Sequence, residues 1–390
     1  MAESIHTSRW ISQIKDNKKF EIYLFPSYAQ RIIRDDLLNI NICIPFFSIY
    51  LLINKIFGKR YANFFHIKII NSRYYYSSIK QKCRLKNYLL KIKPDLIHTL
   101  ETQGAGYLLS EVKINLSNKY VFPLWWHTNW GSDIYIFGKL NEHQQKIKEV
   151  LSNCDYYSCE CQRDVDLAIK FGFKNKVLPV FPNTGGLNTT YINKLFENAK
   201  PTSQRRNIML KGYQGWAGRA LVGIKALSIC ADILKDYTIV VYSNTNSEDI
   251  KIASELLSND FNINVILLDE NTPQDTILYN HSLARISIGL SIGDAISTSL
   301  LEAMAVGSFP IQSCTSCANE WFDNNITGYI APPEDPNEIA NYIRKALLDD
   351  DLVDNASKIN IDKISKFANY DILKEKTNNI YLTLQKNLYE

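Results

Sequence analysis

Two carboxylates near the end of an apolar run are the strongest candidates for chemistry in this chain. Asp294 follows the run 285–291, and Glu302 comes eight residues later in a helical stretch that ends near Gly307. Ligands of parallel α/β sheets bind outside the carboxyl ends of the strands, so both carboxylates can face such a site. Two fixed acceptors there can bind hydroxyl groups of a sugar and of a ribose. The alternative is that Ser299 and Glu302 form a capping box and that Asp294 is a turn residue.

A glycine-rich loop between a strand and a helix opens the second half of the chain. Glycines within 212–218 let the backbone approach an anion, and the helix that follows turns its free N–H groups toward it. Arg219 lies at the start of that helix, with Lys211 before the loop and Lys225 further along, and such cations suit a diphosphate. The spacing is not that of a dinucleotide loop, and the next strand ends without the acid that would bind an NAD ribose. The alternative is a set of tight turns beside a solvated arginine.

Short β-rich runs alternate with helical runs, which is the pattern of α/β layers built on parallel sheets. A polar run at 198–207 marks a boundary. We therefore expect two Rossmann-like domains, an N-terminal one at 1–200 and a C-terminal one at 201–390. The expected strands include 95–100, 120–127, 237–243, 264–268, 285–291 and 308–313, and the expected helices include 141–153 and 163–173.

Composition excludes several classes of protein. The 390 residues are 46% hydrophobic and 22% charged, which is typical of a folded globular protein and unlike a disordered or collagen-like chain. Eight cysteines without a dense framework, and a start without a signal-peptide pattern, favour reduced thiols in the cytoplasm. Cys314 and Cys317 lack a second pair of ligands, so we expect no metal site.

Charge is divided unevenly along the chain. Residues 1–200 hold 28 Lys and Arg against 16 Asp and Glu, whereas residues 201–390 hold 16 against 24. Residues 37–94 hold eleven cations, many aromatic side chains and no acid. The apolar run 42–53 is shorter than the about 20 residues that a membrane span needs, so this region suits an amphipathic surface that contacts anionic lipid. The alternative is ordinary helix faces around the core of the first domain.

Several of these segments resemble a known family. Residues 294–313, with Asp294 and Glu302, and the block 319–347 resemble the two-carboxylate region and downstream block of family-4 retaining glycosyltransferases of the GT-B fold, the bacterial glycosyl transferase group 1 type. The glycine loop with Arg219 resembles their donor-diphosphate site. WGSDIYIFGK (130–139) is similar to their turn that faces the donor sugar. The resemblance covers about residues 4–360.

The resemblance implies two Rossmann-like domains whose parallel sheets face a cleft, with the last helix free to pack back on the first domain. It also implies that a sugar moves from a nucleotide-diphosphate donor with retention. Asp294 would bind hydroxyls of the transferred sugar and Glu302 the donor ribose, and no metal or other cofactor is expected, because cations and helix N–H groups stabilise the diphosphate. The other donor-binding candidates are Gly215, Gly218, Arg219, Lys225, Lys211, Ile296, Ser297, Thr298 and Ser299, and the acceptor-binding candidates are His98, Glu101, His127 and Asp133.

Three departures from the family pattern bear on activity. Asp294 stands where a glutamate is commoner, and Trp130 takes the place of a histidine directly before the Gly-Ser-Asp turn, with His127 three residues earlier. The segment 4–10 resembles the loop and helix start that follow the first strand of the family. That strand has no counterpart here, so we expect an unfilled position in the first sheet, with unpaired backbone groups.

The expected function is a hexosyltransferase-type glycosyltransferase of cell-surface polysaccharide biosynthesis, such as that of lipopolysaccharide or capsule. Its partners would be a nucleotide-diphosphate sugar, a saccharide or polyprenyl-linked acceptor, and the anionic inner face of the plasma membrane. No nucleic acid is expected, because the second half is acidic and contains no recognisable nucleic-acid module. Two alternatives stay open, a catalytically inactive binding protein of the same fold and a sugar-nucleotide epimerase.

Overall fold

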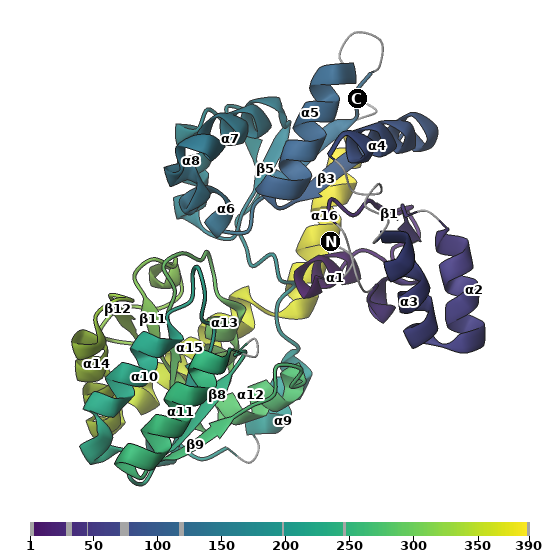
Figure 1. The fold of residues 1–390 in the computed structure, drawn as a ribbon. Helices are drawn as coiled ribbons and strands as arrows, with labels where there is room; N and C mark the ends of the chain where they lie inside the picture. Colours follow the sequence, from purple (N-terminus) through teal and green to yellow (C-terminus); the bar gives the residue numbers. More distant parts are fainter. Residues whose placement is uncertain are drawn as a thin grey trace. The chain divides into compact units, whose positions relative to one another are not determined.

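The structure is a computed structural model that describes residues 4–28, 33–44, 46–70, 78–116, 121–196, 199–244 and 247–387. The chain divides into two compact units. The first comprises Met1–Gly185 together with Leu373–Glu390, and the second comprises Gly186–Ile372. Parallel strands form the sheets of both units, and helices cover them (Figure 1).

The division between the units lies earlier than the boundary expected near residue 200. The helix α9 (Thr189–Phe196) belongs to the second unit, where the Tyr191 hydroxyl donates to the Asp275 carbonyl at 3.2 Å. Most of the last helix, α16 (Tyr370–Lys386), belongs to the first unit, where Trp10 Nε1 donates to the Tyr381 hydroxyl at 3.0 Å. Residues 199–207 are therefore part of the second unit and not a linker, because side-chain packing and not local polarity decides to which unit a segment belongs.

The second unit contains a six-stranded parallel sheet in the order β12-β11-β10-β7-β8-β9. Counted along the unit, this is the 3-2-1-4-5-6 order of dinucleotide-binding folds, and the order reverses between β7 and β10. The strands are β7 (Asn207–Lys211), β8 (Thr238–Tyr242), β9 (Asn264–Leu267), β10 (Ala284–Gly289), β11 (Phe309–Ser313) and β12 (Tyr329–Ala331). The further helices are α10 (Ala220–Ile229), α11 (Glu248–Phe261), α12 (Gln274–Ser282), α13 (Thr298–Ala305), α14 (Pro336–Leu348) and α15 (Asp350–Phe367).

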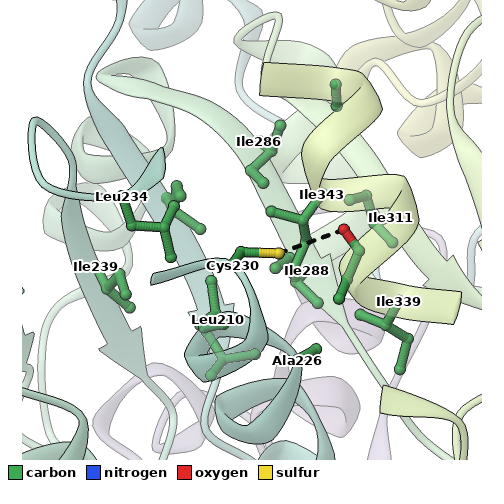
Figure 2. Close-up of a cluster of buried hydrophobic side chains, with 14 of the residues drawn as sticks. Leu210, Ala226, Cys230, Leu234, Ile239, Ile286, Ile288, Ile311, Ile339 and Ile343 are labelled. Atoms are coloured by element: carbon green, nitrogen blue, oxygen red, sulfur yellow. Dashed lines mark hydrogen bonds between the residues drawn. The ribbon is translucent and has the colours of Figure 1, made fainter. Parts of the chain in front are cut away.

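The centre of this sheet is buried on both faces. Every residue of β10 is buried, and Figure 2 shows Ile286 and Ile288 of this strand in one cluster with Ile343 of α14. In the same cluster the Cys230 thiol donates to the Ala340 carbonyl at 3.3 Å. Each fully buried isoleucine contributes about 1.5–3 kcal/mol, so β10 is a firm support for the loop at its carboxyl end.

The first unit contains a four-stranded parallel sheet in the order β3-β4-β5-β6 and a separate parallel pair, β1 and β2. Its strands are β1 (Tyr23–Leu24), β2 (Asn41–Ile42), β3 (Leu96–Leu100), β4 (Leu124–Thr128), β5 (Tyr156–Ser158) and β6 (Lys176–Val177). Its helices before α16 are α1 (Ile5–Ser12), α2 (Phe47–Phe57), α3 (Lys59–Ile70), α4 (Ser78–Ile92), α5 (Tyr107–Leu116), α6 (Ser132–Tyr135), α7 (Asn141–Asn153) and α8 (Gln162–Lys170).

A gap separates β1 from β3, and we call it the strand slot. Among the described residues, β1 pairs only with β2, and β3 pairs only with β4. Two cavities of about 200 and 420 Å³ share residues of both strands as their lining, among them Tyr23, Leu96 and Leu100. Residues of α4 and α5 close the smaller cavity, and residues of α1 and α16 close the larger one. The two cavities therefore lie on opposite faces of one gap between the strands.

Candidate functional site

Two loops meet at the carboxyl ends of β7 and β10, where the strand order of the second unit reverses. Gly218 in the glycine loop after β7 forms an antiparallel bridge with Ser291 after β10. The Ile292 N–H donates to the Ala217 carbonyl at 2.9 Å. The two loops are thus joined at the position where ligands of open α/β sheets bind.

The glycine at 218 is required by the shape of its loop. A Cβ atom there would lie 2.0 Å from the Tyr213 carbonyl oxygen, so any larger residue would displace the backbone. Gly215 has a φ of +140°, which L side chains rarely adopt, and the space around it is open. The loop therefore turns back sharply and directs Arg219 to the start of α10.

Glu302 lies inside α13 with a fixed carboxylate. The helix begins at Thr298 after Ser297, which places Glu302 in its second turn and not at the third helical position. The capping box considered as an alternative is therefore not formed. The side chain of Glu302 is 6% exposed, and Gln274 Nε2 donates to its Oε1 at 2.7 Å. A buried, oriented carboxylate of this kind can accept hydrogen bonds from hydroxyl groups.

Asp294 lies in the loop after β10 and is partly exposed. Its Oδ1 accepts a hydrogen bond from the Ala295 N–H at 2.9 Å. Burial raises the pKa of Tyr213 in the glycine loop, and the negative charge of Asp294 raises it further. Asp294 thus follows Ser291 in the loop that the bridge between Ser291 and Gly218 joins to the glycine loop.

A line of hydroxyl groups connects Lys211 with the start of α13. Lys211 Nζ donates to Ser297 Oγ at 3.1 Å, and Ser297 Oγ lies 2.8 Å from Ser299 Oγ. Burial raises the pKa of Tyr242, and the Glu302 charge adds to this, whereas a hydrogen bond with Ser299 lowers it. Ile296 is buried in the turn before these residues. The sequence predictions for Lys211, Ser297 and Ser299 thus fall on one connected group.

The three cations expected at a diphosphate lie in different surroundings. Lys211 contacts the start of α13, as described above. The Arg219 Nε donates to Glu334 Oε1 at 2.5 Å, and this ion pair holds the guanidinium beside the loop before α14. Lys225 is on the exposed side of α10, and no ion pair to it is found within the described part of the chain. Lys211 and Arg219 are therefore better placed than Lys225 for a ligand at the two loops.

Three of the four acceptor candidates of the first unit meet around Thr102. Its backbone N–H donates to Asp133 Oδ2 at 2.9 Å, and its hydroxyl lies 3.1 Å from His127 Nε2. Glu101 Oε1 accepts from the Gly104 N–H at 2.8 Å and so caps a single turn of π-helix, Thr102–Gly106. Such π-turns are frequent at functional sites.

All three of these side chains have perturbed pKa values, and burial raises that of Glu101. Burial raises the pKa of Asp133 to about 7, and the nearby Glu101 carboxylate contributes. Burial lowers the pKa of His127 to about 3, and this imidazole is fully buried. In this structure His127 can reach a ligand only through its neighbours, so its role in acceptor binding stays a prediction.

His98 lies on the opposite face of its sheet from His127. Its Nδ1 is 2.7 Å from the Tyr381 hydroxyl and its Nε2 is 2.7 Å from Thr128 Oγ1. The ring stacks on Trp126 at 3.9 Å, and burial lowers its pKa. It also lines both cavities of the strand slot. The structure thus separates His98 from the other three candidates.

Four residues around the two loops were not found from the sequence. The Asp294 charge raises the pKa of Tyr213, Gln274 binds Glu302, Tyr242 binds Ser299 and Glu334 binds Arg219. Tyr242 ends the strand next to β7, and this position at a strand end was a usable signal. Gln274 and Glu334 come from distant segments, and no local pattern distinguishes them from surface polar residues.

Comparison with known proteins gives a family for part of the chain. Residues 223–362 match the sequence model of the family described as glycosyl transferases group 1. This range includes Asp294 and Glu302 but begins after Arg219. No curated protein matches the chain.

Solved structures resemble the chain in fold. Sucrose-phosphate synthase from Thermosynechococcus elongatus has a TM-score of 0.60 at 19% identity, over 81% of this chain and 80% of that one. A glycosyltransferase from Rickettsia africae has a TM-score of 0.60 at 15% identity, over 81% and 84%. Anabaena HepE, in complex with UDP-glucose, has a TM-score of 0.59 at 14% identity, over 78% and 82%.

These likenesses show an α/β protein of the GT-B fold, with two Rossmann-like units that contain parallel sheets. Together with the family match they support a group 1 glycosyltransferase.

Proposed function

We propose that this protein is a retaining glycosyltransferase that moves a sugar from a nucleotide-diphosphate donor to a saccharide acceptor. The observation that carries the proposal is the position of Asp294 and Glu302 relative to the sheet. Both follow β10, next to the glycine loop after β7, and the strand order reverses between these two strands. The family match covers the same two carboxylates.

The groups at this position suit the parts of such a donor. Glu302 would accept hydrogen bonds from the ribose, and Asp294 from the hydroxyls of the transferred sugar. Lys211, Arg219 and the first N–H groups of α13 would lie near the diphosphate, whose negative charge grows as the sugar leaves. Cations and dipoles that are already in place lower the barrier to that step, so the proposal includes no metal ion. A diphosphate would compete with the Glu334 carboxylate for Arg219.

The acceptor side of the proposal rests on the first unit. Glu101 and Asp133 follow β3 and β4, at the carboxyl edge of that sheet. We propose that they bind hydroxyls of a saccharide that is free or linked to a polyprenyl carrier. We propose that the protein acts on this acceptor class in lipopolysaccharide or capsule synthesis.

A panel of nucleotide sugars tests the donor. We expect one class among UDP-, GDP- and ADP-sugars to raise the melting temperature, because a ligand at about 100 times its Kd stabilises the folded state by roughly 2.7 kcal/mol. The same donor should release its nucleoside diphosphate only when a saccharide acceptor is added. Conversion of the free sugar nucleotide without acceptor would identify an epimerase, and binding without either reaction an inactive binding protein. A panel without any shift would contradict the proposal.

Replacement of single cations tests where the diphosphate lies. We expect Lys211→Ala to weaken donor binding about tenfold or more, since hydrogen bonds to charged groups contribute about 1.5–3 kcal/mol. Lys225→Ala is the matched control, because this lysine is exposed on α10, and we expect its Kd to stay within about twofold. Calorimetric titration with the donor that passes the panel measures both. The reverse order of effects would show that the diphosphate lies along α10.

A further inference from the structure

The outer side of α2 and α3 is unusually apolar. These two helices lie side by side in the first unit (Figure 1). Leu52 is 56% exposed, Ile56 is 60% exposed and Phe57 is 63% exposed. Tyr61 and Phe64 on α3 are also more than half exposed. Large apolar side chains that gather at one exposed place mark an interaction surface more often than scattered ones do.

The orientation of α2 is set by its inner side, so the apolar outer side is not an accident of a loose helix. Tyr50 is 1% exposed, and its hydroxyl donates to Asn63 Oδ1 at 2.9 Å on the neighbouring helix. Ile49, Leu52 and Ile56 follow at the i, i+3 and i+7 spacing of one helical face. That face points away from Tyr50, where a soluble protein usually carries polar residues.

The charged residues of the segment 37–94, which contains both helices, have one sign. Lys55 and Arg60 are exposed, and no ion pair to either is found within the described residues. No acidic residue occurs anywhere in residues 37–94. Lys59 has a partner, because its ammonium lies 2.7 Å from Asp35 Oδ2. Arg73 and the three tyrosines that follow it lie outside the described residues. The part of the surface that can be described therefore combines apolar side chains with two free cations.

We propose that the outer hairpin face, formed by Ile49, Leu52, Ile56, Phe57, Tyr61 and Phe64, docks on an anionic lipid bilayer. A helix with an apolar face and flanking Lys and Arg lies in the headgroup region, with the apolar face at the boundary to the acyl chains. A lipid surface is fluid and adapts to the shape of the protein, so two adjacent helices can bind it without a complementary groove. No helix in the described part of the chain is long and apolar enough to cross a bilayer, so the contact would be peripheral. The proposal does not depend on sugar transfer.

Among the described side chains, several of the eleven cations of residues 37–94 have partners within the protein, so the apolar side chains carry more of the proposed contact. Lys59 pairs with Asp35 and Lys82 pairs with Glu111. Arg84 donates to the Cys43 carbonyl at 3.4 Å, which turns it toward the protein. Salt should therefore weaken the contact without abolishing it, because screening acts on the charges alone.

Sedimentation of the full chain with lipid vesicles tests the proposal. We expect binding to vesicles of phosphatidylcholine with about a third phosphatidylglycerol, and weaker binding at high salt. The double substitution Leu52→Glu with Ile56→Glu should lower the partition coefficient at least tenfold, because it places two charges in the apolar boundary. Lys55→Glu with Arg60→Glu should lower the partition coefficient by a smaller factor. If the first variant does not fold, this second variant is used to test the proposal.

The matched control lies on α11 in the second unit. Ile252 and Leu256 have the same spacing as Leu52 and Ile56, and they are 49% and 53% exposed. Ile252→Glu with Leu256→Glu adds the same charge to an exposed helix and should leave vesicle binding unchanged. We call Leu52→Glu with Ile56→Glu the hairpin variant. The proposal would be overturned if the hairpin variant and the α11 variant lost vesicle binding equally, or if the hairpin variant lost none. It would also be overturned if the protein bound to no vesicle. A dimer in ultracentrifugation that only the hairpin variant disrupts would also overturn it, and would assign this surface to a second copy of the chain.

Discussion

Replacement of Glu302 by glutamine is expected to lower kcat/KM for sugar transfer by about tenfold to a hundredfold and to leave the fold intact. A hydrogen bond to a charged group contributes about 1.5–3 kcal/mol, and the variant loses such a bond to the donor ribose. The amide oxygen can still accept the hydrogen bond from Gln274 Nε2 that Glu302 Oε1 accepts now. The variant loses the negative charge and one acceptor toward a ribose. Initial rates of nucleoside diphosphate release, with the melting temperature as a check on folding, measure the effect.

A second Glu→Gln variant separates this role from helix capping. Glu338 stands at the third position of α14, three residues after the capping Asp335, whose Oδ1 accepts from the Glu338 N–H at 3.1 Å. We expect Glu338→Gln to keep both the rate and the melting temperature, since glutamine serves equally in a capping box. If Glu302→Gln also keeps its rate, Glu302 is a structural residue and the proposed site is wrong.

The regular elements could be predicted because their patterns are local. The helix expected at 141–153 is α7 with the same bounds, and the strand expected at 285–291 is β10 within two residues. The strand expected at 120–127 begins only at Leu124, after Pro123, since proline has no N–H for a sheet ladder. The boundary near residue 200 was wrong because α9 packs on the second unit through Tyr191.

The residues around the two loops differ in how well the sequence alone could place them. Asp294, Ser297, Glu302 and the glycine loop are close in the sequence to the two strands that place them. Lys225 was expected at the diphosphate, but its neighbours Ile224 and Ala226 are buried, and this pattern already placed it on the outer side of α10. Contacts from distant segments, such as Gln274 to Glu302, depend on how elements pack and leave no local signal.

Among the described residues, neither of the two strand edges that border the strand slot has a strand partner on that side. The Leu124 N–H donates to the Asp95 carbonyl and the Glu101 N–H donates to the Thr128 carbonyl, so the odd-numbered residues of β3 face β4. Backbone groups alternate along a strand, and those of Leu96, His98 and Leu100 therefore face the slot. On β1, the backbone groups of Tyr23 face the strand slot. Those of Ile22 and Leu24 face β2, because their carbonyls accept hydrogen bonds from the segment around β2.

The shape of the slot matches one more strand, parallel to β3 and joined to the start of α1. A strand directs alternate side chains to opposite faces, and the slot has one cavity on each face, lined mainly by apolar residues such as Leu85, Leu109 and Ile14. The start of α1 lies near the carboxyl ends of β3 and β4, because Thr7 lines the smaller cavity and the His6 ring lies 5.5 Å from that of Trp130. A strand that leads into α1 would thus end at the correct edge of the sheet.

Extension of the chain before Met1 by five alternating Val and Ile residues is therefore expected to raise the melting temperature by about 5–10 °C. Three or four newly buried apolar side chains contribute about 1.5–3 kcal/mol each, ordering each backbone residue costs about 1–2 kcal/mol, and hydrogen bonds on both edges add to the gain. A few kcal/mol of stabilisation remain, and each kcal/mol raises the melting temperature by about 2–4 °C in a unit of this size.

An extension of five Gly and Ser residues is the control and should not change the melting temperature. Hydrogen exchange at the amides of Leu96, His98 and Leu100 should slow only with the apolar extension. Equal melting temperatures for the two extensions, or unchanged exchange at these amides, would show that the slot does not accept a strand.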